Sequence, residues 1–309
     1  MRRLFPILLL LVSGCTPFPT PQPAGGSPSA PDRVVPSEAG PGPAQGRPDA
    51  TLQADAGNPA RMEAVATITA SAAPRLAEVL PSPDGAWRAE FYAYDCVEVA
   101  PGVAFAYQEA RLVSTGSGAD ALVESQLIVC GGLGAYGLAG RFWSPNSRYV
   151  YFTNAAAGVP DGCGYWTPPY LRADTVNWTV EALGMGAVSP DGTFLAAWQG
   201  EQLGVWHVDG DLIGLVETPT LVRVPGPIAW RPDSSAIAFL ISEGYCPLGE
   251  THLGRLDLSD MRPIMILAHR NPSFADLVWD APNRLTLADE QGGRWRYNFL
   301  SRDLWEVSP

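Results

Sequence analysis

The sequence predicts an all-β fold for residues 75–309. Three observations support this prediction. First, the 309 residues include 32 Gly and 30 Pro, two residue types that favour turns and interrupt helices. Second, one short turn motif recurs along this part of the chain. Third, each copy is followed by a short run in which aliphatic or aromatic side chains alternate with others, which is typical of β-strands.

The first fourteen residues have the pattern of a secretion signal. Arg2 and Arg3 form a short basic region, and a stretch of nine residues at 4–12 is mainly apolar and precedes two small residues. This stretch is too short to cross a bilayer as a helix, which needs about 20 apolar residues. We therefore expect residues 1–14 to be a signal peptide that is removed on export.

The end of this signal, Leu11-Val12-Ser13-Gly14-Cys15, resembles the lipobox of bacterial lipoproteins. The resemblance implies that the Cys15 thiol receives a diacylglyceryl group and that cleavage occurs just before Cys15. Two or more acyl chains, at about 0.8 kcal/mol per buried CH₂ group, give stable anchoring. The implied location is the extracytoplasmic side of a membrane in the bacterial cell envelope. An ordinary signal peptide with a chance cysteine is the alternative.

Residues 15–59 form a Pro/Gly-rich segment that we expect to be a disordered tether. Positions 16–59 contain 11 Pro and 6 Gly in 44 residues, with almost no large apolar side chain after Phe18. Such a composition buries too little surface to offset the entropy lost on ordering. Residues 60–74 form an uncertain lead-in, for which the sequence allows either a short helix or a strand.

The recurring turn motif divides residues 75–309 into five units. Its copies contain Pro followed by Asp or Asn, and four of them continue with Gly or Ser. Their first residues are 62, 45, 42 and 49 positions apart. The fifth copy is degenerate. The copies are Pro81-Ser82-Pro83-Asp84-Gly85, Trp143-Ser144-Pro145-Asn146-Ser147, Val188-Ser189-Pro190-Asp191-Gly192, Trp230-Arg231-Pro232-Asp233-Ser234 and Trp279-Asp280-Ala281-Pro282-Asn283.

Each unit fits a group of four antiparallel strands. Pro sets φ for a tight turn, and Asp-Gly or Asn tolerates the positive φ that a hairpin requires, so the motif predicts strand, turn, strand. Two further candidate strands lie between copies, as at residues 202–207 and 212–216. Four strands in about 45 residues is the period of a propeller blade. We predict one β-propeller with five blades, or six if residues 60–74 and the long insertion in the first unit supply strands.

The Ser-Pro-Asp-Gly turn, preceded by Trp or an aliphatic residue and followed by an aliphatic-aromatic strand, resembles the WD40-like repeats of the TolB type. The same repeats occur in propellers of prolyl-oligopeptidase relatives. The resemblance covers residues 75–309 and implies a propeller fold. It implies no catalytic residues, because the residues of these repeats are structural. With no hydrolase domain expected after the last unit, we do not expect a peptidase.

Four cysteines follow Cys15, namely Cys96, Cys130, Cys163 and Cys246. An even number in an exported chain favours two disulfides, and four cysteines allow three pairings. In the blade scheme, the first two end the second and fourth strands of the first unit. The other two lie in equivalent loops of the second and fourth units. We therefore hypothesise the pairs Cys96–Cys130 and Cys163–Cys246. The absence of C-x-x-C and H-x-x-x-H spacings disfavours a zinc site.

Aromatic residues gather near these cysteines on loops that the scheme places at one face. Aromatic side chains on disulfide-braced loops can form rigid contact surfaces for sugars, peptides or proteins. The alternative is that they only pack over the mouth of the propeller. The candidate ligand-binding residues are Tyr94, Tyr136, Tyr165, Trp166 and Tyr245.

Composition and motifs disfavour several chemistries. All 20 basic residues are Arg, which excludes a Walker A lysine and a Schiff-base lysine. The net charge of −12 disfavours nucleic-acid binding. Residues 132–137 fit G-x-G-x-x-G, but Pro145 follows too soon for the helix that a nucleotide site needs. The sequence has no Gly-x-Ser-x-Gly nucleophile motif. We assign no catalytic residue, metal or cofactor.

The favoured function is that of a membrane-anchored, non-catalytic binding or scaffold lipoprotein. Loops at one propeller face would recognise a protein or glycan, and disulfides would hold those loops. One alternative is a glycosidase or lyase with paired carboxylates at the propeller axis. Another is a structural component of an envelope complex.

Overall fold

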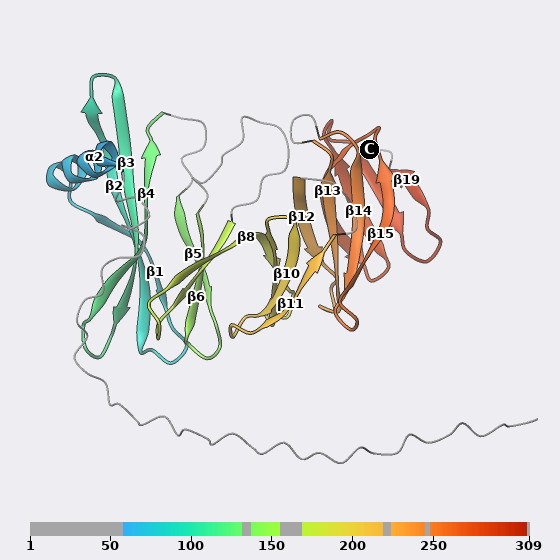
Figure 1. Ribbon diagram of the computed structural model, residues 1–309, viewed down its shortest axis with the longest axis horizontal. Helices are drawn as coiled ribbons and strands as arrows, with labels where there is room; N and C mark the ends of the chain where they lie inside the picture. Colours follow the sequence, from blue (N-terminus) through green and yellow to red (C-terminus); the bar gives the residue numbers. More distant parts are fainter. Residues whose placement is uncertain (1–57, 132–136, 155–168, 219–223, 245–247, 308–309) are drawn as a thin grey trace, which may run out of the picture. The chain divides into compact units, whose positions relative to one another are not determined.

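The computed structural model describes residues 58–131, 137–154, 169–218, 224–244 and 248–307. Its described residues form 19 β-strands in four antiparallel sheets, together with one helix (Figure 1). The all-β prediction is confirmed. The predicted signal peptide, Cys15 and the predicted tether up to residue 57 lie outside the described residues. No helix among the described residues is both long and apolar enough to span a membrane.

The first sheet follows a helix that the sequence left undecided. Helix α2 (Pro59–Ser71) begins with Asn58, whose side chain accepts a hydrogen bond from the Arg61 amide, and with Pro at its first position. It lies against β2 and β3 (Figure 1) and buries Ala64 and Ile68. The strands of this sheet, in order, are β1 (Arg75–Pro81), β2 (Trp87–Ala100), β3 (Val103–Ser114) and β4 (Asp120–Val129).

The second sheet has seven strands because two groups of four share one strand. Residues 180–185 of β8 pair with β7, and residues 186–188 pair with β9. Near the end of the first half, Gly184 has a φ of +84°, and a Cβ atom there would lie 1.9 Å from the Trp198 carbonyl oxygen. Only glycine fits this approach. The strands are β5 (Leu138–Trp143), β6 (Tyr149–Asn154), β7 (Pro169–Asp174), β8 (Val180–Val188), β9 (Phe194–Gln199), β10 (Gln202–His207) and β11 (Leu212–Glu217).

The remaining two sheets have four strands each, also in sequence order. The third contains β12 (Val224–Trp230), β13 (Ala236–Ser242), β14 (Thr251–Asp257) and β15 (Arg262–His269). The fourth contains β16 (Phe274–Ala281), β17 (Arg284–Asp289), β18 (Arg294–Asn298) and β19 (Leu304–Glu306).

All five copies of the turn motif join the first and second strands of a group of four, as the strand-turn-strand prediction requires. The five motifs do not give five separate sheets, because β8 belongs to two groups of four strands, and the described residues form four sheets. The suggested sources of a sixth blade supply no sheet either. The lead-in is helical, and the long first unit is taken up by a lengthened β2–β3 hairpin.

Side-chain hydrogen bonds explain why the motif needs Ser and Asp. In the first turn, the Ser82 hydroxyl donates to Asp84 Oδ1 at 2.6 Å and accepts from the Trp87 amide at 3.0 Å. Asp84 Oδ1 also accepts from the Ala86 amide at 2.9 Å. These bonds hold the pKa of Asp84 below its ordinary value. The second and third turns repeat all three bonds with their own Ser and Asn or Asp.

The Trp at the start of the motif connects neighbouring groups of strands. Trp143 Nε1 donates to the Leu80 carbonyl at 2.8 Å, from β5 to β1. Trp230 repeats this bond from β12 to Ala187 of β8 at 2.8 Å, and Trp279 repeats it from β16 to β12 at 3.0 Å. In each case, the acceptor is the next-to-last residue of the preceding group's first strand. The third group has Val188 at the Trp position and is instead continuous with the second group through β8.

Apolar side chains fill the spaces between successive groups. One cluster lies between the first sheet and β5–β7, and another joins β6 to β8–β10. A third lies between β9–β11 and the third sheet, and a fourth between the third and fourth sheets. Every residue of β13 is buried, because both of its faces contact a neighbouring group. The core is therefore a series of interfaces between sheets.

Candidate binding site

Only some of the residues predicted for the site lie in the described part of the chain. Tyr94, Cys96 and Cys130 are described. The other candidate ligand-binding residues and the other two cysteines lie outside the described residues, as does Cys15. They are Tyr136, Tyr165, Trp166, Tyr245, Cys163 and Cys246.

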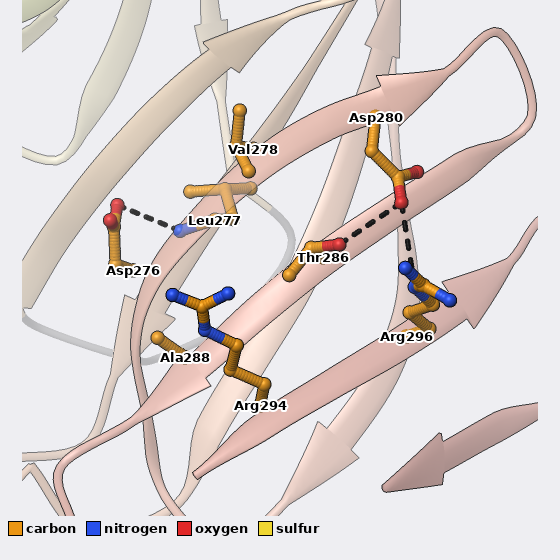
Figure 2. Close-up of a pocket in the computed structure, with 8 residues that line it drawn as sticks. All are labelled: Asp276, Leu277, Val278, Asp280, Thr286, Ala288, Arg294 and Arg296. Carbon is orange, nitrogen blue, oxygen red and sulfur yellow. Dashed lines mark hydrogen bonds and ion pairs between the residues drawn. The ribbon is translucent and has the colours of Figure 1, made fainter. Parts of the chain in front are cut away.

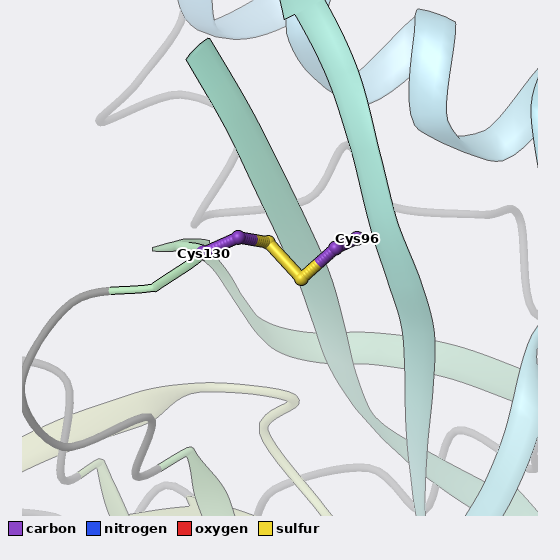
Figure 3. Close-up of a disulfide and its surroundings, with 2 residues drawn as sticks. All are labelled: Cys96 and Cys130. Carbon is purple, nitrogen blue, oxygen red and sulfur yellow. A yellow bond between two sulfur atoms is a disulfide. The ribbon is translucent and has the colours of Figure 1, made fainter. Parts of the chain in front are cut away.

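The predicted disulfide between Cys96 and Cys130 is confirmed (Figure 3). Their Cα atoms lie 6.1 Å apart, and 34 positions separate them in the sequence. The prediction that Cys96 ends its strand is wrong, because β2 continues to Ala100. Cys130 directly follows β4, and β3 lies between the two bridged strands in the sheet. An irregular register between Tyr94 and Val97 accompanies the bridge. The disulfide therefore fixes the end of this sheet.

Tyr94 lines a hollow of about 240 Å³ on the first sheet, close in sequence to Cys96. Tyr92 and Tyr94 are two residues apart on β2, and so are Glu109 and Arg111 on β3. Side chains at this spacing share one face of a strand. The full lining consists of Pro74, Tyr92, Tyr94, Glu109, Arg111 and Asp120. Tyr92 pairs with Glu109 across the two strands, which places the aromatic and charged groups together.

Arg111 holds both carboxylates of the hollow. Its Nε donates to Glu109 Oε2 at 2.8 Å, and its Nη1 donates to Asp120 Oδ1 at 2.9 Å. The side chain of Glu109 is 9% exposed, whereas that of Asp120 is 47% exposed. Arg111 Nη1 also donates to Asp120 Oδ2 at 3.2 Å. Two carboxylates therefore share one guanidinium, and the carboxylate of Asp120 remains the more exposed of the two.

A second set of hydrogen bonds holds the Tyr92 side chain through Glu90, which lies two residues away on the same face of β2. The Tyr92 hydroxyl and Arg88 Nε both donate to the Glu90 carboxylate. Although burial acts in the opposite direction, these bonds hold the pKa of Glu90 below its ordinary value. The bond to Glu90 raises the pKa of Tyr92. Burial, followed by the charge of Glu109, raises the pKa of Tyr94. Both tyrosines are therefore neutral, and Glu90 is ionised, at physiological pH.

The tyrosine rings and carboxylates of this hollow suit recognition of a ligand. Tyr94 packs against Tyr107 with ring centroids 5.4 Å apart, and this contact restricts the orientation of the Tyr94 ring. Rigid aromatic rings next to hydrogen-bond acceptors suit a hydroxyl-rich or cationic ligand surface. Of the residues that line this hollow, the sequence pattern predicted Tyr94 but not Tyr92, Glu109, Arg111 or Asp120. The alternating spacing of these residues can be recognised in the sequence, but the strand register that brings β2, β3 and β4 together cannot.

Carboxylates on the first strands of the four-stranded groups accept hydrogen bonds from backbone amides or from arginine. Glu78 of β1 accepts a hydrogen bond from the Gly140 amide at 2.9 Å. Asp280 of β16 accepts from Arg284 at 2.8 Å, and Asp276 accepts from the Leu277 amide at 2.8 Å. Within the described parts of β5, β12 and residues 186–188 of β8, these strands carry no Asp or Glu.

No family model and no curated protein matches this chain. Among solved structures, it is similar to TolB from Acinetobacter baumannii, with 14% identity, a TM-score of 0.32, and 75% of this chain and 53% of that chain covered. It is also similar to dipeptidyl peptidase 4 from Porphyromonas gingivalis, with 11% identity, a TM-score of 0.41 and coverages of 78% and 41%. It is similar as well to oligogalacturonate lyase from Vibrio parahaemolyticus, with 10% identity, a TM-score of 0.37, and 69% of this chain and 60% of that chain covered. The chain spans between two-fifths and three-fifths of these proteins.

The Glu90 cluster predicts an acid-dependent loss of stability. A glutamate whose pKa is lower in the folded state stabilises the fold above its unfolded pKa, about 4.3. That contribution disappears as the pH falls through the lower folded pKa. We expect Glu90→Gln to reduce the free energy of unfolding at pH 7 by about 1–3 kcal/mol, the range for hydrogen bonds to charged groups. In urea-unfolding experiments at a series of pH values, we also expect the free energy of unfolding of this variant to fall less steeply below pH about 4.3 than that of the wild type.

Glu201→Gln is the matched control, because Glu201 is exposed. If the Glu90 and Glu201 variants had the same dependence of stability on pH, the Glu90 cluster would not stabilise the first sheet in the way described.

Proposed function

We propose that this chain is a bacterial lipoprotein, anchored on the extracytoplasmic side of a membrane, whose body is a β-propeller that binds a protein or glycan without catalysis. The observation that carries the binding role is the hollow lined by Tyr92 and Tyr94, with Glu109 and Asp120 held on Arg111.

The repeated contacts between first strands support a propeller body. In a propeller, the first strand of each blade lines the centre and lies next to the first strands of neighbouring blades. Here β1 contacts β5, β8 contacts β12, and β12 contacts β16. The Trp hydrogen bonds join the same pairs. Counting β8 in both of its groups gives five groups of four strands, one for each turn motif, which supports a body of five blades.

The N-terminal sequence supports the anchor. Residues 11–15 resemble a lipobox, and the Pro/Gly-rich residues that follow would separate the body from the membrane surface. The disulfide between Cys96 and Cys130 is consistent with an oxidising compartment outside the cytoplasm.

The bonding of the carboxylates supports a non-catalytic role. A general acid needs a carboxyl group whose pKa is raised toward neutrality. In the hollow, Glu109 and Asp120 are both bound by Arg111, and the pKa of the adjacent Glu90 is lowered. This arrangement favours carboxylates that act as hydrogen-bond acceptors for a ligand.

Metabolic labelling tests the anchor. We expect radiolabelled palmitate to enter the full chain expressed in a bacterium with lipoprotein export. We expect Cys15→Ala to abolish both the label and membrane association, because Cys15 supplies the acylated thiol. Cys96→Ala, which leaves the lipobox intact, is the control and should keep the label. An unlabelled wild-type chain would contradict the anchor.

An array of purified glycans and envelope proteins tests the binding role. We expect at least one reproducible ligand for the full chain. We expect Tyr92→Ala or Asp120→Ala to weaken its binding about tenfold or more, since buried aromatic contacts dominate interface energies. Trp305→Ala removes a 39% exposed aromatic residue on β19 and should leave binding unchanged. Unchanged binding in the Tyr92 variant would reject this site, and cleavage of an arrayed glycan would reject the non-catalytic role.

A further inference from the structure

A second hollow lies on the fourth sheet and belongs to no part of the site described above. It measures about 390 Å³ and is formed by one face of β16, β17 and β18 (Figure 2). On β16, the alternate residues Leu277 and Trp279 are buried in the core, so Asp276, Val278 and Asp280 face away from it. The face is completed by Thr286, Ala288, Arg294 and Arg296.

Strand register arranges these side chains in two rows across the sheet. Asp276 pairs with Ala288, which in turn pairs with Arg294. The next row runs from Val278 through Thr286 to Arg296. Neighbouring strands lie about 4.8 Å apart, so the backbone positions of Asp276 and Arg294 are separated by about 10 Å, with Ala288 between them.

At one end of this hollow, side chains of the same sheet bind the carboxylate of Asp280. Asp280 accepts hydrogen bonds from Arg284 Nε at 2.8 Å and from the Thr286 hydroxyl at 3.1 Å. Arg296 Nε lies 3.5 Å from the same carboxylate. Although partial burial acts in the opposite direction, the bonds from Arg284 and Thr286 hold the pKa of Asp280 below its ordinary value. Figure 2 shows Thr286 and Arg296 pointing toward Asp280.

The other end is open. Arg294 is exposed and has no ion-pair or hydrogen-bond partner for its guanidinium within the described parts of the chain. In Figure 2 it stands apart from the Asp280 cluster, beside Ala288. Asp276 is also exposed, and the bond found for its carboxylate comes from the amide of the next residue. Ala288, which lies between them, is half-buried, and Val278 in the next row is 55% exposed. The first row thus presents an unsatisfied cation, an apolar floor and a carboxylate.

We propose that this hollow binds an extended peptide segment of a partner protein, with an acidic side chain on Arg294, small aliphatic side chains over Ala288 and Val278, and a basic side chain near Asp276. A guanidinium binds a carboxylate with two parallel hydrogen bonds, which fixes both position and direction. A peptide in the extended polyproline II conformation has three residues per turn and rises about 3.1 Å per residue, so opposite charges three residues apart lie on one face at about 9 Å.

The lining of the hollow favours a peptide over a sugar. Sugar-binding sites rely on aromatic platforms, and none of the eight lining residues is aromatic. The proposal rests on the fourth sheet alone, and it holds whether or not the hollow on the first sheet binds a ligand.

Titration of the isotope-labelled full chain tests the proposal, with the backbone amide signals of β16–β18 as the readout. The probes are acetyl-Glu-Val-Ala-Arg-amide, its reversed sequence, the neutral acetyl-Gln-Val-Ala-Gln-amide, glucuronate and inorganic phosphate. We expect saturable shifts with a charged peptide. We expect Arg294→Ala to weaken its binding about tenfold, because one charge-assisted bidentate contact is lost.

Arg262→Ala is the matched control, since Arg262 is an exposed arginine on a different sheet, at the start of β15. It should leave the titration unchanged. The proposal is overturned if no probe gives saturable shifts, if the neutral peptide binds as well as the charged ones, or if Arg262→Ala weakens binding as much as Arg294→Ala. Binding of glucuronate or phosphate as tight as that of the charged peptides would also overturn it, by indicating a general anion site.

Discussion

The hydrogen bond from the motif Trp to the first strand of the preceding group is the interaction on which the rest of this structure depends. A four-stranded group has apolar side chains on its faces and must cover them with a neighbour. The side chains of Trp143, Trp230 and Trp279 join neighbouring groups in two ways. Each ring is at least 92% buried in an interface core, and each indole nitrogen binds the adjacent strand. The interfaces they hold form the hydrophobic core of the chain.

The same constraint determines where ligands can bind. Groups inside the series use both faces for packing, as the complete burial of β13 shows. In the first and last sheets, buried residues alternate with charged ones, so one face of each is polar. The two hollows lie on these faces, and they differ in chemistry. One has tyrosines and carboxylates, and the other has an unsatisfied arginine above small apolar residues.

Local patterns were enough to predict the turns, their strands and the Cys96–Cys130 bridge, because each depends on nearby residues or on one repeated unit. Features that depend on register could not be predicted. The shared strand β8 requires the close approach at Gly184, and nothing in the local pattern distinguishes it from two strands joined by a loop. The hollow around Tyr92 combines residues from three strands, and only pairing in three dimensions brings Asp120 and Arg111 beside the tyrosines.

Urea unfolding of single Trp→Phe variants tests the central claim most directly. Phe preserves an aromatic ring but cannot donate the hydrogen bond to the adjacent strand, and it fills less of the interface than Trp. We expect Trp143→Phe, Trp230→Phe and Trp279→Phe each to lower the free energy of unfolding by about 1–3 kcal/mol. The exposed Trp305→Phe should change it by less than about 0.5 kcal/mol. Equal effects at all four positions would contradict the claim that these hydrogen bonds connect the sheets.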